Sequence, residues 1–193
     1  MIRPIVAYGM PVLRQKGKEV DWKDPEIKKL VEDLFETMDG ASGVGLAAPQ
    51  VNEAVRVFVI DPAPLAEHKN LSEEEKKLLR NSRMAFINAR KIEESGEPVV
   101  FEEGCLSIPG VYEKVKRPGR ITLEYYDLEG NKQVRTFDGL LARVIQHEYD
   151  HIEGILFTDL LSPLKRRMIK KKLEKIKRGD VQVAYKMKFP RQR

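Results

Sequence analysis

The residues with the clearest capacity for chemistry are two histidines and a glutamate in residues 147–151, which read HEYDH. If this segment is helical, His147 and His151 stand at positions i and i+4 on one face. Both imidazoles can then bind one metal ion while Glu148 flanks it as a base. The chain has three histidines, and two of them occur at this spacing. The pattern also arises in charged surface helices, so the flanking sequence must decide between the two interpretations.

The flanking residues favour a buried helix. Asp138 can cap its N-terminus and Gly154 can end it. Apolar residues between these ends occupy more than one face of the helix: Leu140, Leu141, Val144, Ile145 and Ile152. Polar side chains in a buried helix need partners, and a metal ion satisfies two histidines at this spacing. Core histidines bonded to the backbone are the alternative, which fits Glu148 poorly.

Two histidines leave a metal shell incomplete, because a catalytic zinc-type site has three protein ligands and one open position for water. No histidine follows His151, and Glu174 falls in a basic segment, so the third ligands of thermolysin-like and metzincin peptidases have no clear counterpart. Cys105, the single cysteine, lies in residues 103–107 at the end of a predicted strand and is the remaining candidate. It is either a small buried apolar residue or a thiolate that binds metal.

Length and composition predict one domain over residues 1–193, because 193 residues with 41% hydrophobic and 34% charged content can bury a sizeable core. No segment has the length and apolar character of a signal peptide or a membrane span, so we expect a cytoplasmic protein with no membrane partner. The net charge of +5 is unevenly distributed. Residues 162–193 hold thirteen Lys and Arg against Glu174 and Asp180, a net +11, which leaves −6 for the rest. Nucleic-acid binding is therefore expected only of this basic C-terminal segment.

Periodicity predicts the elements that must position these residues. A helix opens at Asp24, and a short charged helix follows Ser72 within an excursion over residues 61–80. Strands are expected at residues 55–60, 84–92, 99–102, 121–126 and 132–137. From about residue 162, a basic helix and a strand-like extension should follow; the helix's apolar side is Leu164, Met168, Ile169, Leu173 and Ile176. This order predicts an α+β fold, with antiparallel or mixed sheets packed around a central metal-binding helix.

Three motifs together resemble the peptide deformylase family. They are residues 43–50 (GVGLAAPQ), residues 103–107 (EGCLS) and residues 146–151 (QHEYDH), which occur in family order with family-like separations. The resemblance extends from the N-terminus to about Leu161. Ile152 replaces a more usual leucine, and the excursion and the C-terminal extension do not match one family subtype.

The resemblance implies removal of the formyl group from the N-terminal formyl-methionine of newly synthesised polypeptides. Cys105, His147 and His151 would hold one divalent metal ion, Fe²⁺ by resemblance, and Zn²⁺, Ni²⁺ or Co²⁺ could occupy the site. Glu148 would act as general base and then acid for attack by metal-bound hydroxide. The side-chain amide of Gln50 and the N–H of Leu106 would stabilise the oxyanion.

The resemblance also implies how substrate binds. The methionine side chain would enter an apolar pocket formed by Val44, Phe101 and Leu140 with the ring of His147. The backbone of Val44, Gly45 and Gly104 would pair with the peptide like an added strand. The glycines of residues 43–50 have two interpretations, close backbone approach or a turn with positive φ. Arg143 falls near the pocket wall, where the sequence offers no reason for a charge.

Two alternatives differ in class from a deformylase. One is another HExxH metallopeptidase, which an upstream cysteine ligand disfavours. The other is a non-catalytic RNA-binding or ribosome-binding protein whose function resides in the basic segment. For a deformylase, the same segment could hold the enzyme at the ribosome or merely aid solubility. On the first view, truncation before Ser162 should weaken ribosome binding and leave turnover of a free formyl-peptide largely intact.

Overall fold

The structure, a computed structural model, describes residues 1–191. Arg193, which was counted in the basic segment, lies outside the described residues. The helices are α1 (Pro25–Gly40), α2 (Glu73–Arg80), α3 (Gly139–Ile152) and α4 (Pro163–Arg178). The strands are β1 (Ile5–Val6), β2 (Gly45–Ala47), β3 (Val57–Ile60), β4 (Met84–Ser95), β5 (Val99–Cys105), β6 (Ile108–Arg117), β7 (Arg120–Tyr126), β8 (Lys132–Asp138) and β9 (Met187–Lys188). The 3₁₀ turns are η1 (Pro11–Arg14), η2 (Ala48–Val51), η3 (Ala63–Glu67) and η4 (Phe157–Leu160).

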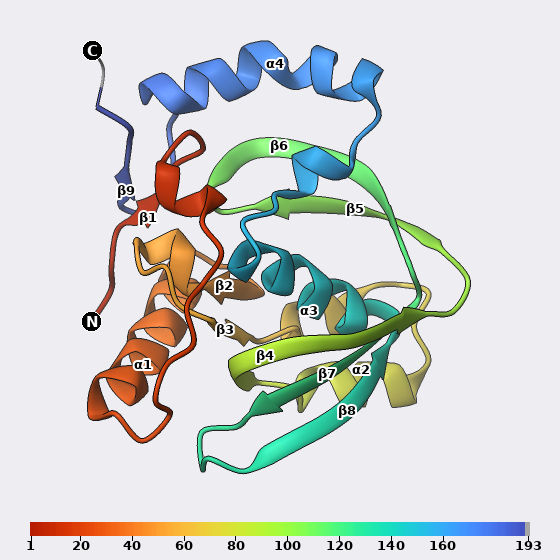
Figure 1. The fold of residues 1–193 in the computed structure, drawn as a ribbon. Helices are drawn as coiled ribbons and strands as arrows, with labels where there is room; N and C mark the ends of the chain where they lie inside the picture. Colours follow the sequence, from red (N-terminus) through yellow and green to blue (C-terminus); the bar gives the residue numbers. More distant parts are fainter. Residues whose placement is uncertain (192–193) are drawn as a thin grey trace.

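A five-stranded antiparallel sheet in the order β2-β3-β4-β7-β8 supports the central helix α3. All four residues of β3 are buried, because both faces of the sheet are covered there. Phe58 and Ile60 lie in the core cluster that includes α3, whereas Val57 and Val59 lie in the cluster that includes α1. Figure 1 shows α3 at the centre of the molecule, with strands beneath it and the β5–β6 hairpin above. The expected α+β fold is confirmed.

The β5–β6 hairpin forms a second layer over α3, and its strand β6 was not predicted from the sequence. We predicted no strand at residues 108–117, which contain Pro109 and Gly110, residue types that usually interrupt strands. Instead, β6 pairs antiparallel with β5, and a sheet of only two strands leaves an outer edge where a proline is tolerated. Ile108, Val111 and Val115 of β6 are buried in a third core cluster.

Helix α4 lies over this hairpin (Figure 1) and begins, as predicted, after Ser162, whose hydroxyl accepts from the Lys165 N–H. Its predicted apolar side is only partly right. Ile169, Leu173 and Ile176 are buried in the third cluster, but Leu164 and Met168 are 68% and 70% exposed. The buried stripe is narrower than expected, since one hairpin covers only part of the helix.

The C-terminal extension packs beside the N-terminal segment. Odd-numbered residues of 181–189 are partly buried and even-numbered ones exposed, as the predicted alternation requires. Only β9 forms a ladder, and it pairs in parallel with β1. The excursion over residues 61–80 is also anchored, since Ala66 and Leu79 belong to the core cluster around α3. Among the described residues, no helix is both long and apolar enough to span a membrane.

Candidate active site

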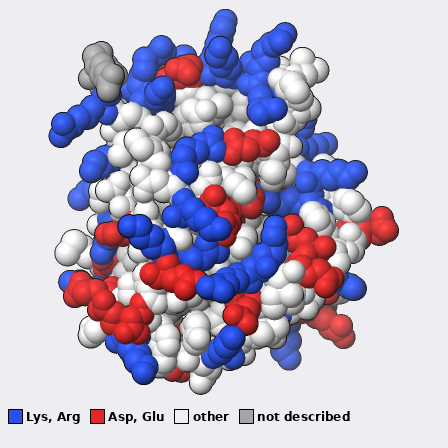
Figure 2. All heavy atoms as spheres, in the orientation of Figure 1, with Lys and Arg blue, Asp and Glu red and all other residues white. Residues whose placement is uncertain are grey.

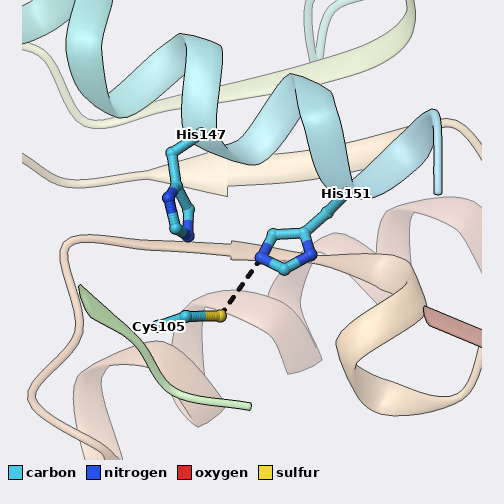
Figure 3. A group of neighbouring side chains, drawn as sticks. All are labelled: Cys105, His147 and His151. Atoms are coloured by element: carbon cyan, nitrogen blue, oxygen red, sulfur yellow. Dashed lines mark hydrogen bonds between the residues drawn. The ribbon is translucent and has the colours of Figure 1, made fainter. Parts of the chain in front are cut away.

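Helix α3 and the end of β5 bring the three predicted metal ligands together. His147 and His151 project from one face of α3 toward Cys105, as Figure 3 shows. Their candidate ligand atoms all lie within 4.8 Å of one another, and Cys105 Sγ is 3.3 Å from His151 Nε2. One sulfur and two nitrogens that converge from two elements are a donor set suited to a transition metal or zinc.

Glu103, two residues before Cys105, organises this site, although sequence reasoning gave it no role. It is buried, and its Oε2 lies 2.9 Å from His147 Nδ1. Donation from Nδ1–H to a carboxylate fixes the tautomer and leaves Nε2 free to bind a metal. Arg117 of β6 donates to both carboxylate oxygens, at 2.6 and 3.0 Å, and also reaches Asp150 of α3. Burial raises the pKa of Glu103, but the bonds from His147 and Arg117 outweigh it and hold the pKa well below its usual value.

The same carboxylate explains Arg143, for which the sequence offered no reason. Arg143 is buried and donates to Glu103 Oε1 at 2.8 Å and to the carbonyls of Val115 and Val99 at 3.1 and 2.6 Å. It therefore joins α3 to both strands of the hairpin and neutralises a buried charge. A sequence signal did exist, because Arg143 interrupts an apolar run, but only the fold identifies its partners.

Glu148 lies at the centre of the site because Gly45 leaves space for it. A Cβ built on Gly45 would come within 2.5 Å of Glu148 Oε1, so the glycine is needed for close approach. Gly45 does not have a positive φ, and this decides between the two interpretations of residues 43–50. Among the described residues, nothing hydrogen-bonds the buried Glu148 Oε2. Burial raises the pKa of Glu148 to about 7. A carboxyl group in this state suits proton transfer near neutral pH.

Gln50 of η2 faces the turn that follows Cys105. The Ala47 N–H donates to Gln50 Oε1 at 2.9 Å, which directs Nε2 toward the β5–β6 turn. There Nε2 donates to Ser107 Oγ at 3.3 Å and to Cys105 Sγ at 3.5 Å. Leu106 occupies the same turn and packs against the α1 cluster. Gln50 and Leu106, the residues of the two predicted oxyanion donors, thus meet at the turn that follows Cys105.

The predicted substrate-binding residues lie in the segment of Val44 and Gly45, on β5 and at the start of α3. Val44 and Leu140 are both partly buried against the core cluster around α3. Phe101 lies on β5, and its ring centroid is 5.9 Å from that of His68, the third histidine. Gly104 is covered by the ring of Tyr112, which a Cβ there would meet at 2.6 Å. The ring of His147 packs on Phe157, at 6.0 Å between centroids.

Comparisons with known proteins agree with this geometry. The family model described as polypeptide deformylase matches residues 2–167. A peptide deformylase of Christiangramia forsetii is 56% identical over 190 residues, which cover 98% of this chain and 97% of that protein. One from Flavobacterium johnsoniae is 50% identical over 189 residues, or 98% of this chain and 96% of that protein. The crystal structure of peptide deformylase from Ehrlichia chaffeensis superposes with a TM-score of 0.81 at 37% identity, covering 93% of this chain and 99% of that one. The chain therefore belongs to the polypeptide deformylase family and is an enzyme of that family.

Proposed function

We propose that this enzyme removes the N-formyl group from the N-terminal formyl-methionine of newly synthesised polypeptides. The observation that carries the proposal is the convergence of Cys105, His147 and His151 beside the buried carboxyl group of Glu148. Family membership removes the alternatives of an unrelated HExxH peptidase and a non-catalytic protein. Since this substrate arises where ribosomes translate, we place the enzyme in the cytoplasm.

Cys105, His147 and His151 would hold one divalent metal ion. Three observations fit this assignment: the donor atoms lie within 4.8 Å of one another, Glu103 fixes the His147 tautomer, and Glu148 Oε2 lacks a partner among the described groups. When bound, the ion would supply Lewis-acid activation of water and of the formyl oxygen. We propose Fe²⁺ from the resemblance to the family, although the donor types also accept Zn²⁺, Ni²⁺ or Co²⁺.

Glu148 would carry the proton through the reaction. Its carboxylate accepts a proton from the attacking water and then delivers it to the departing amine, which leaves as the free N-terminus while formate is released. Burial, which raises the pKa of Glu148 above its usual value, favours a group that can both accept and release a proton. The Gln50 amide and the Leu106 N–H would donate to the developing oxyanion, a contribution worth about 2.7–4 kcal/mol for one such donor.

Recognition of the substrate would combine one apolar pocket with backbone pairing. We assign the methionine side chain to Val44, Phe101, Leu140 and the His147 ring. The backbone of Val44, Gly45 and Gly104 would bind the peptide as an added strand. Main-chain pairing is indifferent to the side chains beyond the first residue, which suits an enzyme that acts on many different nascent chains.

We further propose that the basic helix α4 attaches the enzyme to the ribosome. Lys and Arg side chains project along the edge of the molecule where α4 lies, whereas acidic and basic side chains are mixed elsewhere on this face (Figure 2). A dense array of exposed cations can bind RNA phosphates with strong salt dependence. The structure makes truncation before Ser162 an unsuitable test, because it would also remove Ile169, Leu173 and Ile176 from a core cluster.

Release of formate from formyl-Met-Ala-Ser, measured together with metal content, tests the main proposal. Protein purified without oxygen should turn over the peptide and contain one metal ion per chain. Cys105→Ser should lose most of the metal and the activity, while Ser107→Ala serves as a neighbouring control that should keep the metal. A Cys105→Ser protein with full metal content and unchanged coordination geometry would refute the ligand assignment.

A further inference from the structure

The turn between β5 and β6 is held by contacts from three distant parts of the chain. Leu106 and Ser107 form this turn, so their backbone groups fall outside the hairpin ladder and need other partners. The Tyr8 N–H donates to the Ser107 carbonyl at 2.8 Å, and Gln50 donates to the Ser107 hydroxyl at 3.3 Å. The third contact comes from the C-terminal extension, where the Tyr185 hydroxyl donates to the Leu106 carbonyl at 2.7 Å.

The path of the extension fixes where Tyr185 points. The Ile5 N–H donates to the Lys186 carbonyl at 2.9 Å, and the Ala7 N–H donates to the Lys188 carbonyl at 2.8 Å, so the residue beside Tyr185 is locked to β1. The Tyr185 ring is partly buried against the same core cluster as the Leu106 side chain. Burial raises the pKa of the Tyr185 hydroxyl above its usual value, so it remains a donor across the pH range of a kinetic assay. Pairing of β9 with β1 therefore holds Tyr185 in position for its contact with Leu106.

We propose that Tyr185 is a positioning residue for deformylation, which holds the Leu106 carbonyl so that the N–H of the same residue stays aimed at the oxyanion. The inference rests on the proposed role of Leu106 and deepens it. Leu106 N–H and C=O are separated by only two backbone rotations, so anchoring the carbonyl restricts the direction of the N–H. A donor must be oriented before the charge develops, because reorientation during the reaction would cost part of its benefit.

Tyr185→Phe in the full-length, metal-loaded enzyme removes the hydroxyl and keeps the ring. We expect kcat for formyl-Met-Ala-Ser to fall roughly 3- to 10-fold, as the loss of one neutral hydrogen bond predicts, with KM and metal content unchanged. Tyr126→Phe is the matched control, since Tyr126 is partly buried against the same cluster but stacks on Trp22, 6.2 Å between ring centroids. This control should keep the parental kcat.

Inhibitor binding separates positioning from a general structural role. A formyl-methionine analogue with a hydroxamate group carries a carbonyl oxygen that can accept from the oxyanion donors, whereas a thiol analogue binds metal without one. Tyr185→Phe should weaken the hydroxamate by the same factor as kcat and leave the thiol unchanged. Parental kcat in Tyr185→Phe, or equal weakening of both inhibitors, would overturn the inference. Failure of the proposed function would appear separately, as a parent enzyme that does not release formate.

Discussion

Helices α3 and α4 are both amphipathic, but polar residues of α3 are buried in the site, whereas those of α4 face solvent. In α3, Arg143, Glu148 and His151 are buried, and Arg143 and His151 each have a particular partner on another element. In α4, the buried residues are only Ile169, Leu173 and Ile176, and most of the charged side chains face solvent. Single polar residues should therefore matter greatly in α3, whereas the charges of α4 should matter only together.

The largest difference should appear when one carboxylate is removed from each helix. Glu148→Ala should reduce turnover about 10²–10⁴-fold, because the general base is lost, while the metal and the fold remain. Glu174→Ala is the control on α4, where the exposed carboxylate should leave turnover unchanged. Formate release and metal content are the measurements. A Glu148→Ala enzyme with near-parental turnover would contradict the proposed mechanism.

A second pair of variants compares neighbours on β5. Glu103→Ala leaves Arg143 buried without a carboxylate partner and Arg117 with Asp150 alone, and should reduce the free energy of unfolding by about 3–5 kcal/mol. Glu102→Ala, at an exposed position, should change it by less than about 0.5 kcal/mol. Urea unfolding at neutral pH measures both. Similar stabilities for the two variants would mean that the buried network contributes little.

The pH dependence of unfolding sharpens the same test. Since the folded-state pKa of Glu103 lies below its usual value of about 4.3, its contribution to stability is complete above that pH. The contribution is lost as the pH falls through the lower folded-state pKa. Glu103→Gln cannot titrate, so its stability should fall less steeply in acid than that of the parent. Parallel acid-unfolding curves would contradict this assignment.

A third pair of variants tests the space that Gly45 leaves for the Glu148 side chain of α3. In Gly45→Ala, the added Cβ would lie 2.5 Å from Glu148 Oε1 and should displace the carboxylate, lowering kcat on the order of 10²-fold. Gly40→Ala should leave kcat unchanged, because its Cβ would meet only the flexible end of Ile2, at 3.2 Å. Steady-state kinetics with formyl-Met-Ala-Ser measures both effects. Parental kcat in Gly45→Ala would show that the carboxylate can shift without cost.

The smallest effect on catalysis is expected from the charges of α4. Replacing Lys170, Lys171 and Lys172 with alanine should leave peptide turnover unchanged, because all three are exposed. Co-sedimentation with ribosomes at several salt concentrations gives the slope of the logarithm of the binding constant against the logarithm of the salt concentration. This slope should become less steep by roughly 2–3 if all three lysines contact phosphates. The same change at Lys23, Lys28 and Lys29, exposed residues in and just before α1, is the control. Equal binding by both triple variants would favour the simpler view that the charges aid solubility.

The sequence by itself determined the features that depend on local spacing. The i, i+4 histidine pair and the start of α4 after Ser162 follow from helical periodicity and capping, which act within a few residues. Helix α3 also begins after Asp138 as predicted, but the Asp138 side chain makes no capping hydrogen bond. Three short motifs also sufficed to indicate the family, because each combines unusual residue types in a fixed order. Strand β6 was missed, since its Pro109 and Gly110 carry a local turn signal that pairing with β5 overrides.

Only the tertiary structure decided which distant residues support the site. Glu103 meets Arg143 across 40 positions of the chain, and Tyr185 meets Leu106 across 79. Arg143 looked unexplained and Glu103 unremarkable until the fold paired them. Gly45 could have served a turn or a close approach until α3 was placed against it. The physical reason is that the role of a buried polar group depends on which group it bonds. That partner is set by how whole elements pack across the core, and not by the neighbouring residues in the sequence.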